Sequence, residues 1–140
     1  MLTCRSPHSF LGIDQDGQSS IVKTLGNPDV HLVLRGGGGK TNYHAGEVAT
    51  AAEKLRAAGL PETIMVDCSH ANSGKIPARQ SVVWKELLEQ RKQPNCPVIG
   101  SMLESFIEEG TQPLNANLKY GISITDPCID WSMTKSLLEM

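Results

Sequence analysis

Three chemically active side chains each follow a short apolar run, at the point where a buried strand would end. Arg35 comes directly after the letters LVL, His70 follows IMV within four residues, and Glu104 comes directly after ML. In α/β barrels, polar residues at the carboxyl ends of the strands form the active site, whereas the strand interiors pack the core. The spacing therefore predicts that these three side chains open onto one common site.

His70, Glu104 and Asp126 together make a candidate metal site. An imidazole nitrogen and two carboxylates suit a divalent metal ion that keeps open coordination positions. A carboxylate directly after an apolar strand is costly to bury unpaired, which favours a cation or a hydrogen-bond donor beside Glu104. The three residues lie far apart in the sequence, so spacing alone also allows His70 to be an ordinary histidine satisfied by a neighbour.

The residues around this candidate site are interpreted as structural. Cys68 and Cys128 are alternative ligands, but small buried packing residues are the favoured interpretation for both. In a regular strand, Asp67 would point to the opposite face from Cys68 and His70, so we expect a structural hydrogen bond rather than a base. Lys75, with Asn72 and Ser73, is expected to shape the loop that follows His70.

Arg35 opens a second candidate site, for an anion. It is followed by the glycines Gly36 to Gly39 and by Lys40. Bare backbone N–H groups approach a phosphate closely, and a planar guanidinium binds it through two parallel hydrogen bonds. The alternative is a flexible loop with a solvated arginine, because the letters match neither a dinucleotide-binding nor a Walker loop.

The composition is that of one globular domain and excludes several classes of protein. The 140 residues are 39% hydrophobic and 20% charged, with a formal net charge of −2. There is no basic patch, and the few aromatic residues are scattered, so nucleic acid is not expected as a partner. No apolar run approaches the ~20 residues of a membrane span, and no signal peptide is visible, which predicts a cytoplasmic protein. The four cysteines are widely spaced and are expected to be reduced.

The hydrophobic pattern divides the chain into a hairpin and an α/β part. Residues 8–25 read as two strands around the turn DQDGQ. From residue 30, strands at 32–34, 64–68 and 98–103 alternate with two helices, one closed by Gly59 and one opened by Pro77. A loop of about twenty residues after Glu104 is expected to be a lid or disordered. A final helix is predicted to begin near Asp130, which is a good N-cap.

These segments predict the α/β class, with a parallel sheet connected by right-handed crossovers. Parallel sheets are normally covered on both faces, and three strands are few for such a sheet.

Five segments make the chain similar to one enzyme family. NPDVHLVLRGG, TNYHA, VDCSHANSGK, the glutamate in SMLESFIEEGTQ, and KYGISITDPCIDW resemble, in the same order, the C-terminal part of class I 3-deoxy-7-phosphoheptulonate (DAHP) synthases. The resemblance covers nearly all of residues 8–140, and its most specific parts are SHxNSxK and YGxSITDxC.

This resemblance implies a TIM barrel and an aldol-like condensation of phosphoenolpyruvate with erythrose 4-phosphate, the entry to the shikimate pathway. His70, Glu104 and Asp126 match three of four metal ligands, for manganese, iron, cobalt or zinc. Arg35 matches an arginine that binds the phosphate of phosphoenolpyruvate, and Asp126 would also lie beside erythrose 4-phosphate. His70 would in addition assist proton transfer. The full-length members are expected to be homo-oligomers.

The chain also departs from the family pattern. The fourth ligand, a cysteine on the first barrel strand, and the basic residues that hold the phosphoenolpyruvate carboxylate belong to an N-terminal half that this sequence lacks. The RGGGGK loop is richer in glycine than the RGGK loop usual in the family. We therefore expect the last three β-α units, residues 30–140, preceded by a hairpin insertion at 8–25. As a truncated product or fragment, the chain is expected to be inactive alone.

The hairpin has its own expected role. In feedback-regulated members this element helps to form the aromatic effector site, and Phe10 and Gly12 fall in the relevant strand. A glycine at this position resembles tyrosine-sensitive more than phenylalanine-sensitive members. Two other functions stay open: a non-catalytic remnant that binds a partner barrel half or an aromatic amino acid, and a small metal-binding domain using Cys68, His70 and Glu104.

Overall fold

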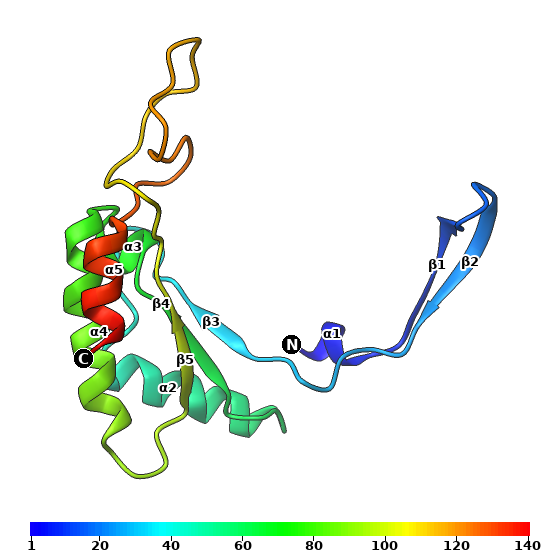
Figure 1. Ribbon diagram of the computed structural model, residues 1–140. Coiled ribbons are helices and arrows are strands. Elements are labelled where there is room, and N and C mark those ends of the chain that lie inside the picture. Colours follow the sequence, from blue (N-terminus) through cyan, green and yellow to red (C-terminus); the bar gives the residue numbers. More distant parts are fainter.

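The structure is a computed structural model that describes residues 1–140. It has an α/β body and a hairpin that stands away from it on an extended connection (Figure 1). A second, irregular projection rises from the carboxyl edge of the sheet in the body. No helix is long and apolar enough to cross a membrane.

The body is built on a parallel three-stranded sheet. Its strands, β3 (Leu32–Leu34), β4 (Ile64–Asp67) and β5 (Val98–Met102), lie in the order β3-β4-β5, with a register irregularity between β4 and β5. The connections run through α2 (Ala45–Ala57), and through the 3-10 helix η1 (Pro77–Arg79) and α4 (Gln80–Arg91). The predicted α/β class and the strand–helix alternation are confirmed.

One face of this sheet is covered and the other is open. Alternate strand residues such as Leu34, Val66 and Val98 are buried against the helices, whereas Val33 and Ile99 on the strands are exposed. A parallel sheet is normally covered on both faces, whereas this one is covered on a single face. The buried set forms one cluster: Leu34, Tyr43, Val48, Ala52, Leu55, Ile64, Val66, Cys68, Val83, Leu87 and Val98.

The predicted hairpin is present, as the antiparallel strands β1 (His8–Ile13) and β2 (Ser19–Thr24). Its turn is tied by Asp14, whose carboxylate accepts hydrogen bonds from the backbone N–H groups of Asp16 and Gln18. Gly17 supplies the positive φ of +77°, as expected for such a turn. A short helix, α1 (Leu2–Arg5), precedes the hairpin and was not predicted.

The chain after β4 differs from the prediction. The expected strand through residue 68 ends at Asp67, and the expected loop contains a short helix, α3 (His70–Ser73), closed by Gly74 in the left-handed conformation. The cause is a sharp turn at His70, which has a positive φ of 50°. A histidine in this conformation is uncommon, and the turn is what aims its ring.

The long segment after β5 was predicted to be either a lid or a disordered loop, and the structure shows that it is ordered. The projection of residues 103–129 is held by bridges that pair Gly110 with Cys128 and Thr111 with Ser123, and by the side-chain amide of Gln112, which bonds to the carbonyls of Lys119 and Ile122. It is therefore not a disordered loop.

The last predicted helix is confirmed as α5 (Trp131–Leu138). The Asp130 carboxylate accepts a 2.6 Å hydrogen bond from the backbone N–H of Met133, so Asp130 is the N-cap that was expected. The indole N–H of Trp84 in α4 donates to the carbonyl of Leu137, which joins the two helices side by side.

Candidate metal centre

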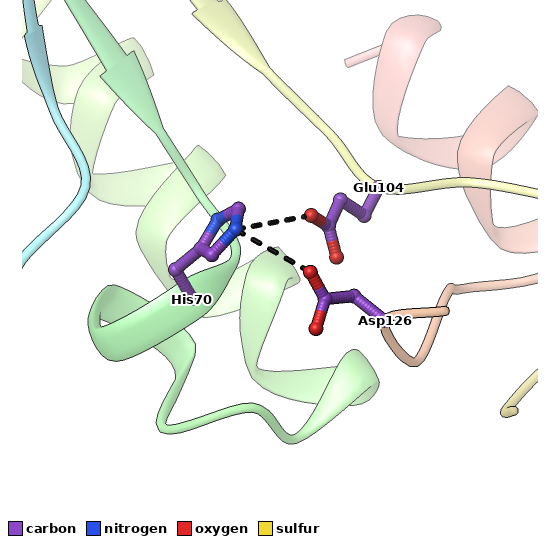
Figure 2. Close-up of side chains that lie close together, drawn as sticks. All are labelled: His70, Glu104 and Asp126. Atoms are coloured by element: carbon purple, nitrogen blue, oxygen red, sulfur yellow. Dashed lines mark ion pairs between the residues drawn. The ribbon is translucent and has the colours of Figure 1, made fainter.

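The structure brings His70, Glu104 and Asp126 together at the carboxyl edge of the sheet (Figure 2). His70 begins α3 just beyond β4, Glu104 lies just beyond β5, and Asp126 lies on the returning limb of the projection. One ligand atom from each residue lies within 4.8 Å of the other two. The three side chains come from separate chain segments, and they converge because neighbouring parallel strands end at the same edge.

His70 points its Nε2 atom into the gap between the two carboxylates. This nitrogen is 3.5 Å from Oε1 of Glu104 and 3.5 Å from Oδ2 of Asp126. Both distances are too long for good hydrogen bonds. Two atoms bound about 2.1 Å from a common tetrahedral ion lie about 3.4 Å apart, so the spacing fits a shared metal ion.

Electrostatics agree with this fit. Glu104 and Asp126 bring two carboxylates to one partly buried site, where their like charges repel each other. Neither carboxylate forms an ion pair with a lysine or an arginine. A divalent cation between them would remove the repulsion, and the mixed nitrogen and oxygen donors suit such an ion.

Asp67 lies on the other side of the His70 ring, which the sequence argument did not expect. Its Oδ2 is 2.8 Å from Nδ1 of His70. The contact does not have hydrogen-bond geometry, so Nδ1 is a buried nitrogen without a hydrogen-bond partner. The prediction that Asp67 faces away from His70 is wrong, because the strand ends at Asp67 and the left-handed turn at His70 folds the ring back. The expected structural hydrogen bond does exist, from the backbone N–H of Ser69 to Oδ1 of Asp67.

Glu104 is held by two residues that sequence reasoning missed. The hydroxyl of Ser69 donates a 2.8 Å hydrogen bond to Oε2 of Glu104. The buried side-chain amide of Gln80 accepts from the backbone N–H of Glu104 at 2.8 Å and donates to its carbonyl at 3.0 Å. A signal for Gln80 was present in the sequence: it stands three and seven residues before Val83 and Leu87, as a polar residue on the apolar stripe of α4.

Arg35 follows β3 at the same edge of the sheet. Leu34 pairs with Val66, so Arg35 comes level with Asp67 at the end of the next strand. The side chain is exposed and makes no ion pair or hydrogen bond within the chain. Its guanidinium is therefore available to an anion that approaches this edge.

The glycine loop after Arg35 has fewer free backbone N–H groups than the sequence predicted. The Gly36 N–H donates to the side chain of Asn42 at 2.7 Å, and Gly37 and Lys40 bond to each other's backbone. These N–H groups are already paired, so they cannot serve an anion without breaking the turn. A Cβ at Gly36 would lie 2.8 Å from the Cβ of Ala71, which explains the glycine there.

Asn72 fixes the loops on both sides of the site. Its side chain donates to the carbonyls of Leu34 and Asp67, and accepts from the backbone N–H of Asn42. Of the residues expected to shape this loop, Asn72 does so through these three hydrogen bonds.

Of the two cysteines expected to be buried packing residues, Cys68 takes that role and Cys128 does so only in part. Cys68 is fully buried in the core, and burial raises the pKa of its thiol to about 12. Cys128 is partly buried; burial is the main cause that raises the pKa of its thiol, which donates weakly to the carbonyl of Asp126. Neither thiol belongs to the ligand cluster. All four cysteines are free.

Phe10 and Gly12 lie on β1 of the hairpin, away from the metal centre (Figure 1). Phe10 is 53% exposed. A Cβ at Gly12 would lie only 2.7 Å from a methyl carbon of Val22 on β2, so a larger residue would displace that side chain.

A parallel sheet with an imidazole and two carboxylates at its carboxyl edge has the architecture of an α/β enzyme. A family model described as the DAHP synthetase I family matches residues 1–139, and the chain belongs to this family. The predicted family is thus confirmed.

Known relatives bear this out. The chain is 45% identical over 141 aligned residues to the Tyr-sensitive phospho-2-dehydro-3-deoxyheptonate aldolase of Escherichia coli K12, covering 99% of the chain and 39% of that protein. It is 44% identical to the Trp-sensitive enzyme of Salmonella typhimurium, covering 96% of the chain and 39% of that protein.

A solved structure is similar as well. The phospho-2-dehydro-3-deoxyheptonate aldolase of Francisella tularensis SCHU S4 superposes with a TM-score of 0.91 at 36% identity, covering 98% of the chain and 40% of that structure. The chain thus spans about two fifths of the length of these relatives.

Proposed function

We propose that this chain forms the C-terminal portion of a TIM (β/α)8 barrel of a DAHP synthase. Residues 30–140 would supply its last three β-α units, and residues 8–25 a hairpin inserted before them. A full barrel of this kind takes about 250 residues. The open face and the two open edges of the β3-β4-β5 sheet support the proposal, since the remaining strands would cover them.

The observation that carries the function is the convergence of His70, Glu104 and Asp126 on one point. We assign these three side chains to a divalent metal ion, with manganese, iron, cobalt and zinc all suited to the donor set. When bound, such an ion supplies Lewis-acid polarisation of the aldehyde oxygen of erythrose 4-phosphate.

The other roles belong to side chains at the same edge. Arg35 holds the phosphate of phosphoenolpyruvate, which positions this substrate and offsets its charge. Asp126, the most exposed of the three ligands, also lies beside erythrose 4-phosphate. His70 takes part in proton transfer, within the limits that ligation sets.

The reaction also needs groups from the N-terminal half of the family: a ligand cysteine and the basic residues for the phosphoenolpyruvate carboxylate. The isolated chain is therefore expected to be inactive.

Complementation tests this function. The purified chain is mixed with the part of the Escherichia coli Tyr-sensitive relative that precedes the matched region, with both substrates and Mn²⁺. We expect DAHP formation from the mixture only, and none when the chain carries Arg35→Ala or His70→Ala. An Arg5→Ala variant, altered far from the site, serves as the matched control. Turnover by the chain alone at a normal enzymatic rate would contradict the proposal.

A second candidate is a non-catalytic remnant that binds a partner barrel half or an aromatic amino acid. The exposed apolar residues Leu11, Ile13 and Ile21 on the hairpin favour it. The same mixing experiment separates the two, because a remnant would form a complex in sedimentation without producing DAHP.

The hairpin is proposed to contribute Phe10 and Gly12 to an aromatic effector site in an assembled homo-oligomer, with tyrosine favoured. The Escherichia coli relative is described as Tyr-sensitive and the Salmonella typhimurium relative as Trp-sensitive. Grafting residues 8–25 into a full-length homologue and titrating it with tyrosine, tryptophan and phenylalanine tests this assignment. Strongest inhibition by phenylalanine or tryptophan would argue against it.

A further inference from the structure

Gln80 is the one large polar side chain that lies fully inside the body. It is completely buried, at 0% exposure, on the apolar stripe of α4. A buried amide must satisfy its donor and its acceptor. Both ends of the Gln80 amide are satisfied by a single residue, Glu104, through its backbone N–H and its carbonyl.

These two hydrogen bonds take the place of a backbone partner beyond the end of β4. The last ladder bond between β4 and β5 runs from the Cys68 N–H to the carbonyl of Met102. Beyond it the chain turns away into α3, and no backbone from β4 remains to pair with Glu104. The Gln80 amide offers a donor and an acceptor in the arrangement of a peptide group, and so extends the ladder to Glu104.

Glu104 is held from its other side as well. Its carbonyl also accepts a 2.9 Å bond from the N–H of Ile129, and the carbonyl of Ile129 accepts from the N–H of Phe106. Ile129 is fully buried and lies three residues after Asp126. The carbonyl of Glu104 thus joins α4 to the segment that carries Asp126.

Ser69 binds one of the two oxygens of the Glu104 carboxylate and leaves the other to face His70. Oε2 is taken by the Ser69 hydroxyl at 2.8 Å, while Oε1 is the oxygen that lies 3.5 Å from Nε2 of His70. Ser69 is itself 3% exposed, and its N–H is bonded to Asp67. This fixes the rotation of the carboxylate and leaves Oε1 free to face His70.

We propose that Gln80 and Ser69 are positioning residues for metal binding: Gln80 sets the backbone position of Glu104, and Ser69 sets the rotation of its carboxylate. The inference rests on the proposed function, because it presupposes that Glu104 is a metal ligand. Both residues act through their hydrogen bonds to Glu104. Outer residues that orient a ligand typically change metal affinity about 10- to 100-fold when they are replaced.

The test is Co²⁺ binding to the purified 140-residue chain, followed by visible absorption, which reports both affinity and the geometry around the ion. Gln80→Met keeps the length of the side chain but removes both hydrogen bonds to Glu104. Gln90→Met is the matched control: it lies on the same helix and loses a hydrogen bond to the carbonyl of Tyr43 instead. Ser69→Ala removes the bond to Oε2.

We expect Gln80→Met and Ser69→Ala each to weaken Co²⁺ binding by about 10-fold or more and to alter the absorption bands. Gln90→Met should bind within about twofold of the wild type, because its lost bond does not reach Glu104. Far-UV circular dichroism verifies the fold of each variant.

The possible failures are distinct. Wild-type-like binding by a folded Gln80→Met chain overturns the role of Gln80, and so does an equal loss in Gln90→Met. If Gln80→Met does not fold, Ser69→Ala decides: a folded variant with unchanged affinity and spectrum refutes the positioning of Glu104. If the wild type itself binds no Co²⁺, the proposed metal site fails, and this inference fails with it.

Discussion

The body and the hairpin contain the same kinds of apolar residue, but the body buries them and the hairpin exposes them. Ile64 in β4 is fully buried, whereas Ile13 and Ile21 in the hairpin are 77% and 71% exposed. An isolated two-stranded hairpin is marginally stable in water, while a sheet with a covered face can fold cooperatively. Buried apolar residues in the body therefore stabilise this chain, whereas the large apolar side chains of the hairpin stay exposed, on an element that stands away from the body (Figure 1).

The largest expected effect tests this contrast directly, with one substitution made in both regions. Ile64→Ala removes a fully buried side chain and should lower the free energy of unfolding by about 2–5 kcal/mol. Ile21→Ala removes an exposed one and should change it by no more than about 0.5 kcal/mol. Urea denaturation followed by circular dichroism measures both. Equal losses would mean that the hairpin is packed in solution.

The metal centre belongs to the body alone, which gives the second prediction. Glu104→Gln removes a ligand charge and should weaken Co²⁺ binding by at least about 100-fold, more than the loss of an outer residue. Glu86→Gln makes the same chemical change beside His44 in the body, away from the ligands. This control and Ile21→Ala in the hairpin should both bind Co²⁺ like the wild type. A similar loss in either control would show that the binding site lies elsewhere.

Sequence patterns predicted the body better than the details of its site. The strands β3 at 32–34 and β4 at 64–67, the hairpin and the N-cap at Asp130 follow from local rules, although β4 ends one residue earlier than predicted. The convergence of Arg35, His70 and Glu104 at one edge follows from strand order. The contact between Asp67 and His70 depends on the positive φ of His70, which no side-chain pattern signals. The amide of Gln80 reaches a residue 24 positions away, so its partner is visible only in three dimensions.

The third prediction uses a thiol of the body. Burial raises the pKa of Cys68 from 9.0 to about 12. The protonated thiol is thus favoured in the folded chain, and its stabilising contribution is complete below pH 9 and lost between pH 9 and 12. The advantage of the wild type over Cys68→Ala should shrink in that window by up to about 1.4 kcal/mol per pH unit. Urea denaturation at pH 8, 9.5 and 10.5 measures it.

The control for this comparison is Cys4→Ala, because Cys4 is exposed in α1, before the hairpin. Its difference from the wild type should stay constant over the same pH values. A constant difference for Cys68→Ala as well would show that Cys68 is solvated in the folded state.

The smallest expected effects on stability come from removing one capping carboxylate in each region, Asp130 in the body and Asp14 in the hairpin. Asp130→Ala removes the side-chain bond to the N–H of Met133 at the start of α5 and should lower the free energy of unfolding by about 1 kcal/mol. Asp14→Ala removes two bonds to N–H groups, from Asp16 and Gln18, but these close a turn that no other part of the chain covers. Global stability should hardly change. Instead, amide exchange in the hairpin should speed up, because its strands open locally without unfolding the body. Equal global losses from the two substitutions would show that hairpin and body unfold together, and the contrast between them would no longer hold.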